Sequence, residues 1–220
     1  ARSWFDRAAA LAPPPDLAQR IRIGQARSAE YTGDLAAAAA VFRLIASHAG
    51  AEQEDWLLHA AEADLKRGEL DLGMTTIAAL LNARHVPSAQ GKWRAMASGM
   101  STMSRTAIIR KLPNRLHAHP SDDQMLCRIY RIVASYLSTP RPIEAFEFLA
   151  RLMALTDPEQ DPRTHSLAKA MWAGYLAAGS IGMMGGRAIR EAVTLADACD
   201  DPYAKMVAAS AEGILLVCQG

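Results

Sequence analysis

Apolar residues recur along the chain three and four residues apart, and they seldom alternate with polar residues as strands require. The apolar segments are rich in alanine and are separated by glycine or proline. This pattern predicts an all-α chain with helices over 2–12, 16–32, 35–48, 52–67, 70–83, 89–112, 122–138, 141–156, 163–178, 185–199 and 202–218. Because the predicted loops are short, we expect neighbouring helices to lie antiparallel.

Two turns share one sequence pattern, 35 residues apart. Gly33 and Gly68 each follow a helix of about four turns, and each precedes an acidic residue, a leucine and another helix. Glycine supplies the left-handed conformation that ends a helix. A bulky residue, Phe42 or Ile77, follows each turn, and small residues flank both turns: Ala26, Ala29, Ala38, Ala60, Ala61 and Gly73. A helix pair that repeats in this way cannot bury its apolar face alone, so we expect the pairs to stack.

The spacing and residue types of these turns resemble the tetratricopeptide repeat. The small residue that this repeat has before the turn matches Ala26 and Ala61, and its aromatic or apolar position after the turn matches Phe42 and Ile77. The large aromatic residues of its first helix are missing here, apart from Trp56, which lies one position away.

This resemblance implies a single helical-repeat domain over residues 1–220, a TPR-like α-solenoid. Antiparallel helix pairs would form a right-handed superhelix, with clear repeats at about 16–50 and 51–86 and divergent repeats over 87–220. The opening WFDRAAALAP resembles the second helix of a preceding repeat, and the last two glycines are spaced like the small residue and turn glycine of another. We therefore expect the sequence to be a fragment of a longer chain.

A narrower resemblance extends over nearly the whole chain. Large bacterial fusion proteins carry an N-terminal eukaryotic-like serine/threonine kinase, a central signalling ATPase of the AAA/STAND type and a C-terminal helical-repeat region. Segments similar to that last region are RGELDLGMTTIAALL, LCRIYRIVASYLSTPRPIEAFEFLARLMALTDP, AKAMWAGYLAAGS and AIREAVTLADACDDPYAKMVAASAEGI. The resemblance implies a non-catalytic protein–protein interaction and sensing module that regulates an ATP-binding serine/threonine protein kinase. The alternative is the effector-sensing arm of a STAND-type bacterial transcriptional regulator.

The resemblance also implies a partner-binding surface. In such scaffolds the first helix of each pair lines a concave face that binds peptides or helices. The matching positions in this sequence are Arg20, Arg27, Glu30, Tyr31, Asp55, Glu62 and Lys66. Their mixed charges predict a polar groove of modest affinity, in which charge sets binding register and association rate. The expected partners are a protein or peptide, or other domains of the parent chain.

Composition changes this picture little. Charged residues make up 21% of the chain and the formal net charge is +1, so no global attraction to nucleic acid or to an anionic membrane is expected. The apolar runs are too short to span a bilayer. The three cysteines lack metal-binding and disulfide-framework spacing, which fits reduced thiols in a cytoplasmic protein.

Two motifs invite a chemical interpretation. The segment GSIGMMGGR at 179–187 precedes a helix, but it lacks the GxxxxGK[ST] pattern of a phosphate loop, and we interpret it as a flexible interhelical loop. His117 and His119 lie in a proline-flanked loop without a third ligand at helical spacing, so no metal site is expected. The chain also lacks kinase and ATPase motifs. We therefore expect no catalytic residues, no cofactor and no enzymatic activity.

A basic stretch begins within the second repeat. No acidic residue occurs from Leu72 to Ser121, where the basic residues are Arg84, Lys92, Arg94, Arg105, Arg110, Lys111 and Arg115. An apolar stripe runs along one helical face within it, formed by Trp93, Met96, Met100, Met103 and Ala107. We interpret this stripe as a buried core face, and the alternative is an adaptable, methionine-rich docking groove. The basic face leaves an acidic partner, an acidic segment of the parent chain or nucleic acid open, with protein partners preferred.

The last predicted helix carries many apolar residues and few charges. Its apolar residues include Met206, Val207, Ile214, Leu215, Leu216 and Val217. Lys205 and Glu212 are the charges that relieve this surface. An exposed apolar patch usually binds a partner, so we expect weak self-association through this helix.

Overall fold

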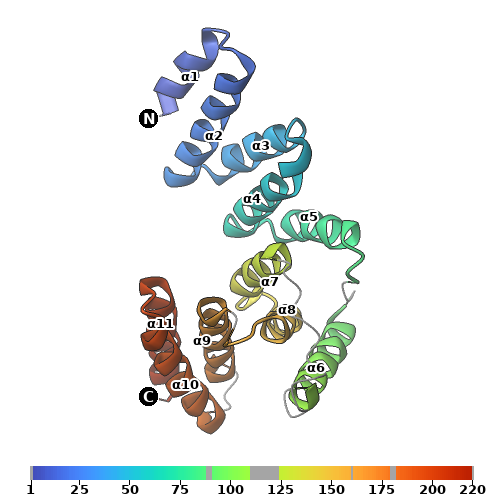
Figure 1. Ribbon diagram of the computed structural model, residues 1–220, viewed down its shortest axis with the longest axis vertical. Helices are drawn as coiled ribbons and strands as arrows, with labels where there is room; N and C mark the ends of the chain where they lie inside the picture. Colours follow the sequence, from blue (N-terminus) through green and yellow to red (C-terminus); the bar gives the residue numbers. More distant parts are fainter. Residues whose placement is uncertain (1, 88–90, 110–123, 160, 179–181, 220) are drawn as a thin grey trace. The chain divides into compact units, whose positions relative to one another are not determined.

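The computed structural model describes residues 2–87, 91–109, 124–159, 161–178 and 182–219 (Figure 1). These residues form eleven α-helices, one short 3-10 helix and no strand, as the all-α prediction requires. The helices are α1 (Arg2–Ala10), α2 (Pro15–Tyr31), α3 (Leu35–Ala46), η1 (Gly50–Glu52), α4 (Gln53–Lys66), α5 (Leu70–Ala83), α6 (Lys92–Ile109), α7 (Gln124–Leu137), α8 (Pro142–Leu155), α9 (Pro162–Ala178), α10 (Gly182–Cys199) and α11 (Pro202–Gln219). Among the described helices, none is both long and apolar enough to cross a membrane.

The predicted helices all occur, and their ends differ from the predicted ends by three residues or fewer. Helix α5 begins and ends where the pattern placed it. Prolines start α2 and α8, because proline has the backbone φ of a helix and its missing N–H is not needed in the first turn. The chain divides into two compact units, unit 1 (Ala1–Ser88) and unit 2 (Ala89–Gly220).

The two predicted turns of unit 1 have the same geometry. Gly33, between α2 and α3, has a φ of +80°, and Gly68, between α4 and α5, has a φ of +88°. At both turns the amide of the residue after the glycine donates to a carbonyl five residues back, at 2.9 and 3.0 Å respectively. These bonds close Schellman motifs, which satisfy the last carbonyls of the preceding helix. The left-handed glycines predicted from the sequence are therefore confirmed.

Small residues lie where α2 meets α3 and where α4 meets α5. Ala26 and Ala38 are buried in a cluster that also contains Phe42. In the second pair, a Cβ added at Gly73 would lie 2.7 Å from the side chain of Leu65, so any larger residue would have to displace that side chain. The predicted close approach of the two helices in each pair is thus confirmed.

Aromatic rings connect the first helix pair to the second. Phe42 of α3 stacks on Trp56 of α4, with ring centroids 6.0 Å apart, and on His59, 5.3 Å away. Each helix of unit 1 contacts the next one along the chain, from α1 to α5 (Figure 1). The two pairs therefore share a continuous packed interior.

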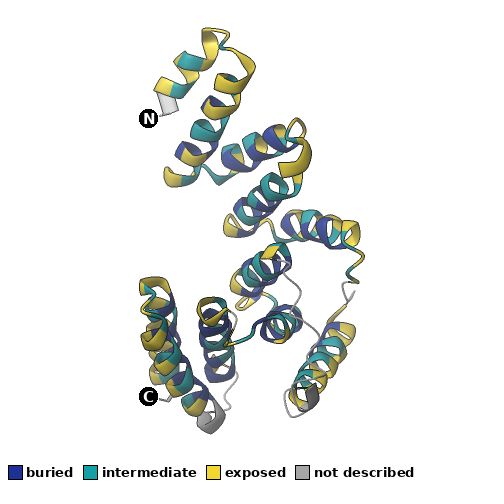
Figure 2. Ribbon diagram, in the orientation of Figure 1, coloured by how far each residue is buried: buried dark blue, intermediate teal, exposed yellow. Residues whose placement is uncertain are grey.

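Unit 2 is organised around two helices. Helix α8 contacts both α6 and α7, and α9 contacts both α10 and α11. Alanines dominate the buried cluster of α9, α10 and α11, with Leu167, Leu176 and Ile189 as its larger members. Figure 2 shows these buried positions on the inner sides of the helices.

One local interpretation of the sequence was wrong. The segment at 179–187 was interpreted as a loop, but α10 already begins at Gly182, and residues 179–181 lie outside the described part of the chain. A Cβ added at Gly185 would lie 3.3 Å from backbone atoms of Ala177, so the glycine allows α10 to pack closely on α9. Gly185 therefore permits a close contact between two helices and is not part of a flexible loop.

The turn geometry predicts how Gly68 responds to substitution. No atom lies within 4 Å of a Cβ built at Gly68, so a side chain there is disfavoured by backbone conformation and not by crowding. We expect Gly68→Val to lower the free energy of unfolding by about 1–2 kcal/mol, and Gly68→Asn by less, because asparagine tolerates positive φ. Urea unfolding followed by circular dichroism measures both. Equal losses for the two variants would contradict the turn geometry.

Candidate partner-binding surfaces

The predicted concave surface lies on α2 and α4 of unit 1, the first helices of the two pairs. The structure brings three of its seven residues together: Lys66 Nζ lies 2.6 Å from Glu30 Oε1 and 3.3 Å from Glu62 Oε1. Glu30 belongs to α2, whereas Glu62 and Lys66 belong to α4. One lysine therefore links the two helices that are expected to line the surface.

The other four predicted residues lie outside this ion cluster. Arg20, Arg27 and Tyr31 are exposed along α2, spaced seven and four residues apart, which places them on one face of the helix. The Tyr31 side chain is 91% exposed. Asp55 is half-buried near the start of α4. The surface thus presents separate polar groups and an exposed aromatic ring beside one ion cluster.

The charges of this surface balance. Three of the seven residues are basic, three are acidic, and the seventh is a tyrosine. Arginines supply several donors in a planar fork, carboxylates accept hydrogen bonds, and tyrosine adds a large rigid contact. The arrangement suits binding of a polar peptide and contains no nucleophile–base pair for catalysis.

A buried carboxylate that the sequence reasoning missed ties the two helix pairs together. The Asp64 side chain in α4 has 0% exposure. It forms an ion pair with Arg43 of α3 and another with Arg67, whose Nη2 lies 3.1 Å from Asp64 Oδ1. The sequence signal that could have indicated the burial of Asp64 is its position in the repeat. The equivalent residue 35 positions earlier is Ala29, which is buried and apolar.

The first cation of the basic stretch is used inside unit 1. Arg84 follows α5, and its Nε donates to Glu54 Oε2 near the start of α4 at 3.0 Å. This bond joins the two ends of the second helix pair. Arg84 therefore stabilises the fold and does not contribute to a basic binding face.

Unit 2 contains a second buried carboxylate. Glu147 of α8 is buried and pairs with Arg151, with Oε1 and Nη2 2.6 Å apart. Ser98 of α6 donates its hydroxyl to the same oxygen at 2.9 Å. The Arg151 guanidinium also lies over the ring of Tyr130 in α7, 5.9 Å from its centroid. This network connects α6 and α7 to α8.

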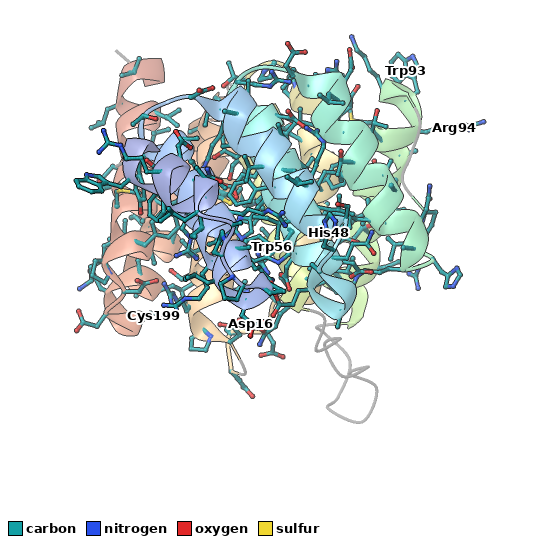
Figure 3. All side chains as sticks on the ribbon, turned by 90° about the horizontal axis from the view of Figure 1, so that it is seen from above. Asp16, His48, Trp56, Trp93, Arg94 and Cys199 are labelled. Atoms are coloured by element: carbon teal, nitrogen blue, oxygen red, sulfur yellow. The ribbon has the colours of Figure 1, made fainter. Side chains whose placement is uncertain are left out.

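The interpretation of the α6 apolar stripe as core was wrong. The Trp93 side chain is 85% exposed and Met100 is 59% exposed. Ala107 is also exposed, and Met96 and Met103 are half-buried. Figure 3 shows Trp93 and Arg94 extending away from the helix.

Small residues form the face of α6 that packs on α8. Ala95 and Gly99 are buried there. A Cβ added at Gly99 would lie 2.5 Å from the ring of Phe146 in α8, so the close contact excludes larger residues. The large apolar residues and the small residues of α6 both recur with helical spacing. Phe146 packs against the small residues, so their face is the buried one.

An open depression of about 410 Å³ lies between α9 and α10. Charged residues line it, and Lys169 Nζ lies 2.7 Å from Glu191 Oε2. The hydrogen bond from Lys169 lowers the pKa of Glu191, and a weaker contribution comes from Arg187. Lys169 and Glu191 are therefore paired with each other, and Arg190, Thr194 and Leu195 complete the lining.

Helix α11 exposes much of the apolar set predicted from the sequence. Met206, Ile214, Leu216 and Val217 are exposed, whereas Val207 and Leu215 pack against the alanine-rich cluster of unit 2. Tyr203 adds a further exposed ring. The helix therefore has one packed face and one apolar face open to solvent.

In the part of the chain that the structure describes, no three His, Cys, Asp or Glu residues come close enough to hold a metal ion. The pair His117 and His119 lies outside that part. Comparisons of the chain with protein-family models, curated proteins and solved structures find no match.

Because Asp64 is buried, we expect the loss of Arg43 alone to lower stability more than the loss of Arg43 and Asp64 together. We expect Arg43→Ala to lower the free energy of unfolding by about 1–3 kcal/mol, because it leaves a buried carboxylate with one cation. Adding Asp64→Ala should recover much of this loss, since alanine is the equivalent residue in the first repeat. Urea unfolding of both variants tests this, with the exposed-pair variant Lys205→Ala as a control. Additive losses in the double variant would contradict the assignment.

Proposed function

We propose that the chain is a non-catalytic interaction module that binds a peptide or a helix on the surface formed by α2 and α4. The observation that supports this proposal is the ion cluster of Lys66. This lysine joins Glu30 of α2 to Glu62 of α4, and so links the first helices of two successive pairs. Stacked pairs of this kind form extended concave binding surfaces. In this proposal the helix pairs stack as a TPR-like, right-handed superhelix.

The exposed residues on α2 support this assignment. Arg20, Arg27 and Tyr31 share one face and have side chains available to a partner. Arginine and tyrosine are enriched among residues that dominate binding energy at interfaces. A partner with carboxylates or backbone carbonyls opposite the two arginines would be recognised by hydrogen bonds.

The proposed role in the parent protein is sensing. Binding of a partner to the repeats would bias a cytoplasmic serine/threonine kinase–ATPase, following the sequence resemblance. An effector-sensing arm of a STAND-type transcriptional regulator remains the second candidate. The domains encoded beside this chain in its gene separate the two, because kinase motifs support the first candidate and a DNA-binding domain supports the second.

The binding surface is tested by selecting ligands from a random dodecapeptide library displayed on phage, with the full chain as bait. We expect selected peptides to shift NMR signals of α2 and α4, and we expect Tyr31→Ala to weaken their binding about tenfold. Tyr203→Ala on α11 is the matched control, since it also removes an exposed tyrosine. Failure to select any peptide that maps to α2 and α4, or equal effects of the two substitutions on such peptides, would refute the proposal.

We also propose weak self-association through the exposed face of α11. The observation is the apolar set Tyr203, Met206, Ile214, Leu216 and Val217, which no described helix covers. Ala209, Ser210 and Gly213 are small and exposed between these residues, so two copies of the helix can approach closely. An apolar face of this kind lowers its free energy by contact with a second copy.

Sedimentation velocity over a range of concentrations tests this association. We expect a concentration-dependent sedimentation coefficient that the double variant Met206→Glu/Val217→Glu removes, because like charges then face each other across the contact. Leu44→Glu places a charge at an exposed leucine of unit 1 and should leave the association unchanged. A clean monomer at millimolar concentration would contradict it.

A further inference from the structure

The outer face of α6 combines an exposed tryptophan, exposed methionine and unpaired cations. Trp93, Ala97 and Met100 lie three and four residues apart along the solvent side of the helix. An exposed tryptophan of this kind is uncommon on a surface that has no partner, because its ring removes a large apolar area from water when it is covered. The face is therefore a candidate contact surface that is separate from α2 and α4.

The two edges of this face differ in chemistry. At 100° per residue, Arg94 and Arg105 fall on one edge, and the half-buried Met96 and Met103 fall on the other. Methionine side chains adapt to the shape of an apolar partner. The face consequently offers an apolar strip with a flexible edge on one side and a basic edge on the other.

Among the described residues, the cations of this face form no ion pair. Helix α6 contains no aspartate or glutamate, and no ion pair joins Lys92, Arg94 or Arg105 to another described residue. The buried Glu147 is already neutralised by Arg151 on the opposite side of α6. The positive charge of the outer face is thus available to a partner.

We infer that the outer face of α6 is the docking site of an acidic amphipathic helix. A helix lays an apolar strip into such a face through residues at i, i+3, i+4 and i+7, and the strip on α6 has the same period. Arg94 and Arg105 are eleven residues apart, which separates them by about 16 Å along the axis. The complementary partner carries acidic residues about eleven positions apart on one flank of its apolar strip.

Other anionic partners fit the face less well. A membrane surface or a single nucleic-acid strand gains most of its affinity from many basic residues, and the described part of this face offers three. Its apolar strip is narrow and helical in period, as a helix partner requires. The experiment below separates these partners from an acidic helix.

The probes are 18-residue synthetic helices with a leucine strip and two glutamates spaced 4, 7 or 11 residues apart, labelled with a fluorophore. Fluorescence anisotropy with the full chain measures their binding. We expect the 11-residue spacing to bind tightest, a scrambled peptide of the same composition to bind at least tenfold more weakly, and added salt to weaken binding.

Substitutions assign the contact to α6. We expect Trp93→Ala to weaken binding about tenfold and Arg94→Gln/Arg105→Gln to weaken it while reducing its salt dependence. The matched controls are Trp4→Ala, which removes another exposed tryptophan (70% exposed), and Arg187→Gln/Arg190→Gln on α10. Because all these side chains are exposed, circular dichroism should show unchanged helicity in each variant.

The inference is overturned by any of four results. These are no saturable binding of the helices below about 1 mM, equal binding of the scrambled peptide, equal effects of Trp93→Ala and Trp4→Ala, and tighter binding to phosphatidylserine vesicles or a 20-nucleotide strand than to any peptide. Failure of these probes leaves the peptide surface on α2 and α4 untouched, because that surface is tested with different variants.

Discussion

Close approach of helices at small residues is the constraint on which this structure depends. In unit 1 the approach requires that the chain reverse within three residues, which Gly33 and Gly68 permit through their positive φ. In unit 2 the same closeness occurs at Gly99 and Gly185, where a Cβ would meet a neighbouring helix. Much of the buried core is alanine. Helices that lack large side chains gain stability from close contact of their backbones, so small residues decide which face is buried.

Close packing also explains the polar groups in the interior. An alanine-rich interface leaves little volume for water, so a buried carboxylate needs a protein partner. Asp64 and Glu147 meet this need in the same way, since each pairs with an arginine whose stem runs to the surface. Asp64 connects α4 to α3, and Glu147 connects α8 to α6. Lys66 makes a comparable connection on the surface, where it joins α2 to α4.

The local signals in the sequence were sufficient for the fold class and for the turns. Glycine and proline mark helix ends through their backbone conformations, which is why α5 and both repeated turns were placed correctly. The α6 stripe was assigned to the wrong face because periodicity does not distinguish large from small residues, and the fit of Phe146 against Gly99 is a tertiary contact. The ion pair of Asp64 with Arg43 is equally non-local. The surface residues could be assigned only by resemblance, and their partner depends on chemistry outside the chain.

The repeat itself can be tested by removing one. Excision of residues 34–68 joins Gly33 to Glu69 and keeps the 35-residue register, so α5 should pack on α2 as it does on α4. Excision of residues 36–68 removes two residues fewer. This changes the helical register and turns Gly73 away from its small partners. Thermal unfolding followed by circular dichroism compares the two chains. The first should keep a cooperative transition and the second should lose it or melt well below it, whereas identical melting of both chains would contradict a repeated helix pair.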